Sequence, residues 1–123
     1  MKLEIRITED DADSERIEWL TQNLVNQLYD LDIDEIERLK KGNLPSGAKG
    51  DPLTLGAISL GIATVVIPSL FSFIQNWVSD RRRVSIEAPN GTKVEFVADK
   101  KYSQEEIIEL VQELNKVTST ETS

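Results

Sequence analysis

The chain has 123 residues, enough for one domain with a sizeable core, and its 22 acidic against 14 basic residues give a formal net charge of −8. This balance argues against nucleic acid as a partner, because contacts to phosphates need an excess of Lys and Arg. The chain contains no Cys and no His, which removes thiol nucleophiles, His-based acid–base catalysis and the usual zinc sites, so we expect no enzyme, no metal and no cofactor.

Residues 1–39 are expected to form a strand, a helix and a second strand. Residues 2–8 alternate apolar and polar side chains, which predicts a half-buried strand. The acidic run that follows is suited to cap a helix, because carboxylates favour the positive end of a helix dipole. Over residues 14–29 apolar side chains recur every three or four positions, which predicts an amphipathic helix. Residues 31–39 mix both periods, and we favour a short strand there.

The amino-terminal residues, MKLEIRITEDDADS, lack the apolar core and the small-residue cleavage site of a signal peptide. We therefore expect no signal peptide, and we expect the chain in the cytoplasm or at the cytoplasmic membrane. The absence of Cys fits a reducing compartment.

Three aspartates, Asp30, Asp32 and Asp34, have the opening spacing of a calcium-binding loop. That motif requires Gly at its sixth position and Glu at its twelfth, where this chain has Glu35 and Lys41. We expect a solvated acidic turn at this place instead of a metal site.

Residues 40–52 are rich in Gly, Pro and Lys, which predicts a flexible loop. Within it, Gly47, Lys49 and Gly50 are the candidate hinge or cleavage point, because exposed loops of small and polar residues are preferred sites of proteolysis.

Residues 53–78 form an apolar stretch without a charged residue. A helix of about 20 apolar residues spans a bilayer, so the stretch predicts one long hydrophobic helix that is long enough to cross a membrane. The alternatives are a buried core helix, a helical hairpin broken at a proline, or an oligomerisation element. The residues that we assign to membrane attachment or assembly are Leu53, Gly56, Ala57, Gly61, Pro68, Phe71, Phe73 and Trp77. Ala57 and Gly61 have the spacing of small residues that lets helices approach closely.

A dense basic run, Arg81, Arg82 and Arg83, follows the apolar stretch. Together with Trp77 it has the order of an interfacial anchor followed by positive charges at a cytoplasmic membrane face. The run is therefore a candidate contact for anionic lipid head groups, with a solvated helix end as the alternative.

Residues 79–117 are expected to form a β-hairpin and a helix, followed by a frayed polar tail over residues 118–123. Two alternating runs flank Asn90-Gly91, the dipeptide that suits a type I′ turn. Ser103 and Glu106 have the spacing of a capping box at a helix start. The expected fold is thus α+β, with a small sheet of the amino-terminal strand and the hairpin, two amphipathic helices and one long hydrophobic helix. A ferredoxin-like arrangement is compatible with this order, but the strand order does not follow from the sequence.

The order of these parts resembles the effector-associated constant component family of bacteria, notably actinomycetes and cyanobacteria. The resemblance covers nearly the whole chain and rests on "LEIRIT", "GAKGDPLTLG", "QNWV" and "VSIEAPNGTKVEF". It implies a component of prokaryotic conflict or immunity systems that couples variable sensors to effectors such as caspase-like or trypsin-like peptidases. It carries no catalytic residue, and the acidic helix suits a cyanobacterial-type relative.

We accordingly expect a non-enzymatic adaptor whose hydrophobic helix serves membrane attachment or self-assembly. Its partner would be an effector peptidase or a sensor of the same system, with a second copy of the chain and membrane lipid as further candidates. The alternative is a membrane-perturbing, pore-forming effector whose apolar segment inserts when a protease or sensor triggers it.

Overall fold

The structure is a computed structural model that describes residues 1–39 and 56–115. Its elements follow one another as β1 (Lys2–Glu9), α1 (Ser14–Leu28), β2 (Glu35–Arg38), β3 (Gly56–Gly61), the short 3₁₀ helix η3 (Thr64–Val66), α2 (Ile67–Trp77), β4 (Arg82–Glu87), β5 (Lys93–Phe96) and α3 (Gln104–Leu114).

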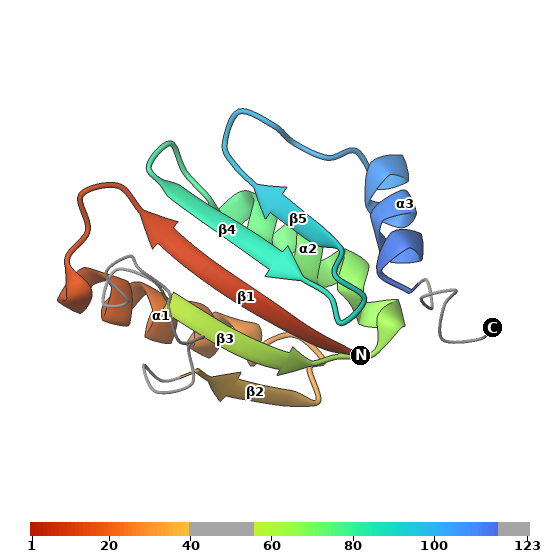
Figure 1. Cartoon of the computed structure of the whole chain (residues 1–123), viewed down its shortest axis with the longest axis horizontal. Coiled ribbons are helices and arrows are strands. Elements are labelled where there is room, and N and C mark those ends of the chain that lie inside the picture. Colours follow the sequence, from red (N-terminus) through yellow and green to blue (C-terminus); the bar gives the residue numbers. More distant parts are fainter. Residues whose placement is uncertain (40–55, 116–123) are drawn as a thin grey trace.

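The five strands form one sheet in the order β2-β3-β1-β4-β5, and all neighbouring strands are antiparallel. Helices α1 and α2 lie on the same face of this sheet, and α3 packs against α2 at the β5 side (Figure 1). The elements from β1 to β4 have the β-α-β-β-α-β order and strand arrangement of a ferredoxin-like fold. β5 and α3 extend it at the edge of β4.

The core lies between the sheet and the helices. On β1, alternation places Leu3, Ile5 and Ile7 under the helices, and all three are fully buried. The apolar stripe of α1 and the inner side of α2 cover them. At the β5 side, the ring of Phe96 meets the edges of two other rings, those of Phe71 and Tyr102. One continuous apolar layer therefore holds both halves of the chain together.

Several predictions of local structure are confirmed. The first strand and first helix lie where the periodicity indicated, and a four-residue strand, β2, lies within residues 31–39. The capping box at Ser103 and Glu106 is present, with both reciprocal hydrogen bonds. The tail at 118–123 and the loop at 40–52 lie outside the described residues.

The predicted long hydrophobic helix over residues 53–78 is wrong. Its first described part is β3, which lies between β1 and β2 in the sheet, and its last part is α2, a helix of only 11 residues. No helix in the described parts of the chain combines the length and the apolar character that crossing a bilayer requires.

The physical reason for this error is that β3 is an inner strand with little polar alternation. Gly56, Ala57, Ile58 and Leu60 are all buried, so the strand reads as a continuous apolar run that joins the apolar helix without a charged break. Pro68 lies in the first turn of α2, where its missing N–H costs nothing, and it therefore starts the helix instead of kinking one.

The predicted type I′ turn of the hairpin is also wrong. Asn90 does not have a positive φ, whereas Gly91 does, at 91°. The N–H of Gly91 donates to the carbonyl of Ala88, whose own N–H donates to the carbonyl of Thr92. This is a type I turn followed by a glycine bulge, and it is favoured because Pro89 fixes the φ that the second turn position needs.

Candidate protein-interaction surface

The open face of the sheet carries alternating charges. On β1 the outward side chains are Lys2, Glu4, Arg6 and Thr8, none of them buried. The guanidinium of Arg6 lies 3.2 Å from the carboxylate of Glu4 and 3.5 Å from that of Glu87 on β4. Because Glu4 and Glu87 are direct cross-strand neighbours, Arg6 separates two like charges that would otherwise repel.

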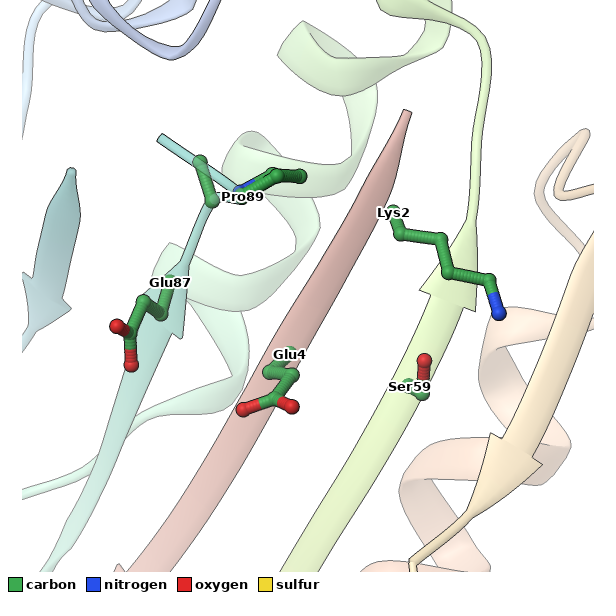
Figure 2. A pocket seen from close by; sticks show the side chains of 6 residues that line it. Lys2, Glu4, Ser59, Glu87 and Pro89 are labelled. Atoms are coloured by element: carbon green, nitrogen blue, oxygen red, sulfur yellow. The ribbon is translucent and has the colours of Figure 1, made fainter. Parts of the chain in front are cut away.

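A groove of about 340 Å³ lies on this open face (Figure 2). Its lining consists of Lys2, Glu4, Ser59, Glu87, Ala88 and Pro89. In Figure 2, Lys2 and Glu4 extend from β1, and Glu87 extends from the end of the neighbouring strand β4. The ion pairs through Arg6 engage both carboxylates, so the groove has the character of a solvated, charge-balanced surface.

The opposite, helical side of the molecule carries no charge over two long stretches. The 11 residues of α2 include no charged side chain, and neither does α1 with its cap from Trp19 to Tyr29. We call the following exposed and half-buried side chains of these stretches the uncharged helical face: Trp19, Gln22, Asn23, Asn26, Gln27 and Tyr29 of α1 and its cap, with Ser69, Ser72, Phe73 and Asn76 of α2. Pro68 and Gln75 of α2 are also half-buried but are not included, and Gln75 forms hydrogen bonds with the backbone of Tyr102.

Two aromatic side chains stand out on this face. Trp19 is 55% exposed and Tyr29 is 67% exposed, while the inward side of the same helix is buried. Aromatic residues are enriched and charged residues are depleted in the cores of protein interfaces, and bulk apolarity alone does not distinguish them. The composition of the uncharged helical face therefore matches a surface that docks protein.

Hydrogen bonds between side-chain amides fix the α1 part of this face. The amide of Gln22 donates to Asn26 at 3.0 Å, and that of Gln27 donates to Asn23 at 2.6 Å. Such pairs four residues apart restrict side-chain freedom before any partner binds, which lowers the entropy cost of docking.

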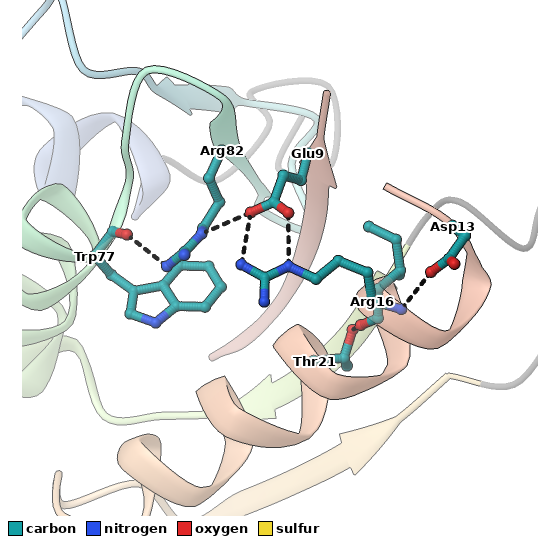
Figure 3. Close-up of polar contacts among 7 residues, drawn as sticks. Glu9, Asp13, Arg16, Thr21, Trp77 and Arg82 are labelled. Atoms are coloured by element: carbon teal, nitrogen blue, oxygen red, sulfur yellow. Dashed lines mark hydrogen bonds and ion pairs between the residues drawn. The ribbon is translucent and has the colours of Figure 1, made fainter. Parts of the chain in front are cut away.

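A cluster of ion pairs and stacked rings joins the two helices at one end of the face (Figure 3). The guanidinium of Arg82 lies 4.4 Å from the ring centroid of Trp77 and 3.4 Å from the carboxylate of Glu9. Glu9 also accepts a 2.7 Å hydrogen bond from Arg16, whose guanidinium lies 4.9 Å from the ring centroid of Trp19. Glu9 thus holds β1, α1 and β4 together and aligns two Arg–Trp stacks.

The cluster shifts the ionisation of Glu9. The hydrogen bond from Arg16 is the main reason that the pKa of Glu9 lies below its ordinary value of 4.5; burial opposes the shift and Arg82 adds to it. On the outer side of α1, a hydrogen bond from Arg38 of β2 likewise lowers the pKa of Glu18. Both carboxylates serve structural ion pairs.

The arginine run predicted as a membrane-interface cluster makes contacts within the protein. Arg82 donates to the carbonyl of Trp77 at 3.1 Å, besides pairing with Glu9. Arg83 pairs with Asp10 at 3.0 Å, and the carbonyl of Arg81 accepts a backbone hydrogen bond from Asp10. The run therefore closes the acidic turn after β1 onto the start of β4.

The structure distributes the other predicted site residues over the core and the surface. Ala57 and Gly61 lie on β3, opposite Arg6 and Lys2 of β1, and do not form a helix contact. A Cβ on Gly56 would lie 2.1 Å from the hydroxyl oxygen of Thr21, so this glycine allows the close approach of α1. Phe71 and Trp77 are buried, whereas Phe73 is half-buried. The remaining predicted residues, Leu53, Gly47, Lys49 and Gly50, lie outside the described residues.

Two further observations bear on the chemistry. Within residues 1–39 and 56–115, no group of three or more Asp or Glu side chains is placed to hold a metal ion. A second groove of about 340 Å³ lies along α3, lined by Tyr102, Glu106, Glu109, Leu110, Gln112 and Glu113.

Sequence reasoning missed the uncharged helical face because the apolar run over residues 53–78 was the stronger pattern. The available signal was the absence of charge from Trp19 to Tyr29 in a chain that is 29% charged. No protein-family model, curated protein or solved structure matches this chain. The family resemblance therefore stays a prediction.

Proposed function

We propose that this chain is a non-enzymatic binding module, an adaptor that docks a protein partner on the uncharged helical face. The observation that carries the proposal is the absence of charged residues from the later part of α1, beginning at Trp19, and from the whole of α2, two helices that lie on the same face of the sheet. A solvated helix surface in such an acidic chain would carry Lys and Glu, as the open sheet face does.

The resemblance to the effector-associated constant component family supplies the class of partner: an effector peptidase or a sensor of the same prokaryotic conflict system. Docking on a preformed face suits such a coupling role, because the face needs no rearrangement of α1 or α2. The alternative of a triggered membrane-perturbing effector would require β3 to leave the sheet between β1 and β2, and no contact among the described residues favours that.

The test is a titration of the purified chain against a purified peptidase or sensor encoded beside it. Asn26→Lys and Ser72→Lys each place one positive charge on the face, and we expect each to weaken binding by at least about tenfold, since burying an unpaired charge is costly. Ser59→Lys is the matched control: it adds the same charge to the groove of the open face, between Glu4 and Glu37 on the neighbouring strands.

The proposal requires Ser59→Lys to bind like the wild type. The assignment of a peptidase or sensor as the partner is abandoned if neither binds. The helical face is abandoned as the docking surface if Ser59→Lys weakens binding while the two helical substitutions do not.

A further inference from the structure

Six residues of α1, QNLVNQ over residues 22–27, read nearly the same in both directions. The segment from Trp19 to Tyr29 is WLTQNLVNQLY, in which Gln22-Asn23 precedes, and Asn26-Gln27 follows, the central pair Leu24-Val25. Reversal about this midpoint exchanges Gln22 with Gln27 and Asn23 with Asn26. Leu24 and Val25 are buried, whereas the four amides are exposed or half-buried.

The hydrogen bonds follow the same symmetry. Gln22 donates from its amide nitrogen to the side-chain oxygen of Asn26, and Gln27 donates from its amide nitrogen to that of Asn23. The reversal turns the first bond into the second. The two bonds of this amide stripe are therefore pseudo-symmetric in residue type and in direction, while Gln22 additionally accepts a hydrogen bond from Arg38 of β2 at 3.2 Å.

Such a stripe is what a twofold contact between identical chains requires. In an isologous interface each residue pair occurs twice, so the surface patch has to be complementary to itself. Two α1 helices that cross antiparallel with their outward sides in contact, at the height of Leu24 and Val25 along the helix, bring Asn23 of each copy to Asn26 of the other. Carboxamides are both donors and acceptors, so Asn can pair with Asn across the axis.

Charge supports the same occupant. Two chains of net charge −8 repel each other, and contact is least opposed where neither presents a carboxylate. The twofold axis also brings Asp30 of the second copy to Trp19, over which the guanidinium of Arg16 is stacked. An opposite-charge contact of this kind would then occur at both ends of the stripe.

From these observations we infer that the uncharged helical face binds a second copy of this chain, as an antiparallel, twofold α1–α1 contact centred on the four outward amides of residues 22, 23, 26 and 27. The inference rests on the proposed docking role of this face and names a second copy as the partner, in place of the peptidase or sensor that the family resemblance implies. The amide stripe of α1 forms the centre of the interface.

The experiment uses the full chain and two charge variants. Light scattering and sedimentation, from about 1 μM to about 1 mM, should give twice the chain mass of 13.8 kDa at the upper concentrations. Asn23→Glu and Asn26→Lys should each raise the dissociation constant of the dimer by at least about tenfold. An equimolar mixture of the two should recover the dimer, because Glu at position 23 of one copy faces Lys at position 26 of the other while Asn26 and Asn23 still pair across the axis.

Thr8→Glu and Ser59→Lys, on the open sheet face, are the matched controls and should dimerise like the wild type. All positions are at least partly exposed, and thermal melts verify that each variant is folded. A wild-type chain that is monomeric throughout this range overturns the inference, and so does a mixture that dimerises no better than the single variants. If that monomer still binds a peptidase or sensor through the same face, the proposed function stands while this inference fails. If neither association is seen, both fail.

Discussion

The two faces of this molecule use polar residues in opposite ways. The open sheet face presents charged side chains in alternation, and Arg6 there pairs with both Glu4 and Glu87. The helical face presents carboxamides, hydroxyls and aromatic rings without a single charge from Trp19 to Tyr29 or along α2.

This difference indicates that the open sheet face remains hydrated, whereas the helical face can lose its water against a partner. A paired but exposed charge contributes little to stability and is costly to bury, so a charged face stays with solvent. A carboxamide or an aromatic ring can be desolvated against a partner that offers hydrogen bonds. The sorting of charge, more than the amount of apolar surface, identifies the docking face here.

The largest effect should come from the apolar layer that both faces share. Phe71→Ala removes a fully buried ring that packs edge-on against Phe96 at 5.2 Å between centroids, and it should lower the free energy of unfolding by about 3–5 kcal/mol. Phe73 lies two residues further along α2 and is half-buried, so Phe73→Ala should lower the free energy of unfolding by only about 1 kcal/mol. Urea denaturation of both variants measures the contrast. Equal losses would mean that Phe73 belongs to the core and not to the helical face.

An intermediate effect should come from the position where the helical layer meets the sheet. Gly56→Ala would place its Cβ 2.1 Å from the hydroxyl of Thr21, which donates to the carbonyl of Ile17 at 2.7 Å. We expect a loss of about 1–3 kcal/mol in unfolding free energy, because either α1 or the Thr21 side chain has to move.

Thr21→Ala removes the obstructing hydroxyl and supplies the control for this prediction. In the Thr21→Ala background, Gly56→Ala should cost less than half of what it costs alone, which a double-mutant cycle measures. Additive losses would show that the hydroxyl is not what limits the approach of α1 to β3.

The sequence alone predicted those elements that have one buried side and one solvent-exposed side. The strand at residues 2–8 and the helix at residues 14–29 follow this rule, and the capping box at Ser103 follows from local hydrogen bonding. The rule fails for β3, which neighbours cover so completely that its periodicity disappears. The type I′ turn predicted at Asn90 is wrong because Pro89, with its fixed negative φ, occupies the first central position of the turn. Asn90 takes the second central position without a positive φ.

The candidate surface was only partly accessible to sequence reasoning. The absence of charge and the reversed order of Gln22-Asn23 and Asn26-Gln27 are visible in the printed sequence. Their meaning depends on which side of α1 faces outward and on the hydrogen bonds between the amides, and both are properties of the folded chain. Among the predicted residues of the apolar run that the structure describes, Phe73 contributes its side chain to this surface. Gly56, Ala57, Phe71 and Trp77 are buried instead.

The smallest effect should come from the ion pairs at the border of the two faces, and it depends on pH. The pKa of Glu9 is lowered below 4.5 in the folded state, chiefly by the hydrogen bond from Arg16, so this carboxylate stabilises the fold above pH 4.5. The contribution is lost as the pH falls below 4.5 and through the lower folded pKa, because protonation removes the charge that both arginines bind. Glu9→Gln should therefore flatten the acid branch of stability against pH, measured by denaturant titration at each pH.

Arg16→Gln removes the main cause of that shift and should flatten the same branch, while leaving the smaller pairing between Glu9 and Arg82 in place. In the Glu9→Gln background, Arg16→Gln should produce no further flattening, since the two residues act through one hydrogen bond. Glu18→Gln, which breaks the separate pair with Arg38, should flatten the branch additively with Glu9→Gln. A profile of Glu9→Gln that keeps the steepness of the wild type would show that this border cluster does not link the helical layer to the sheet.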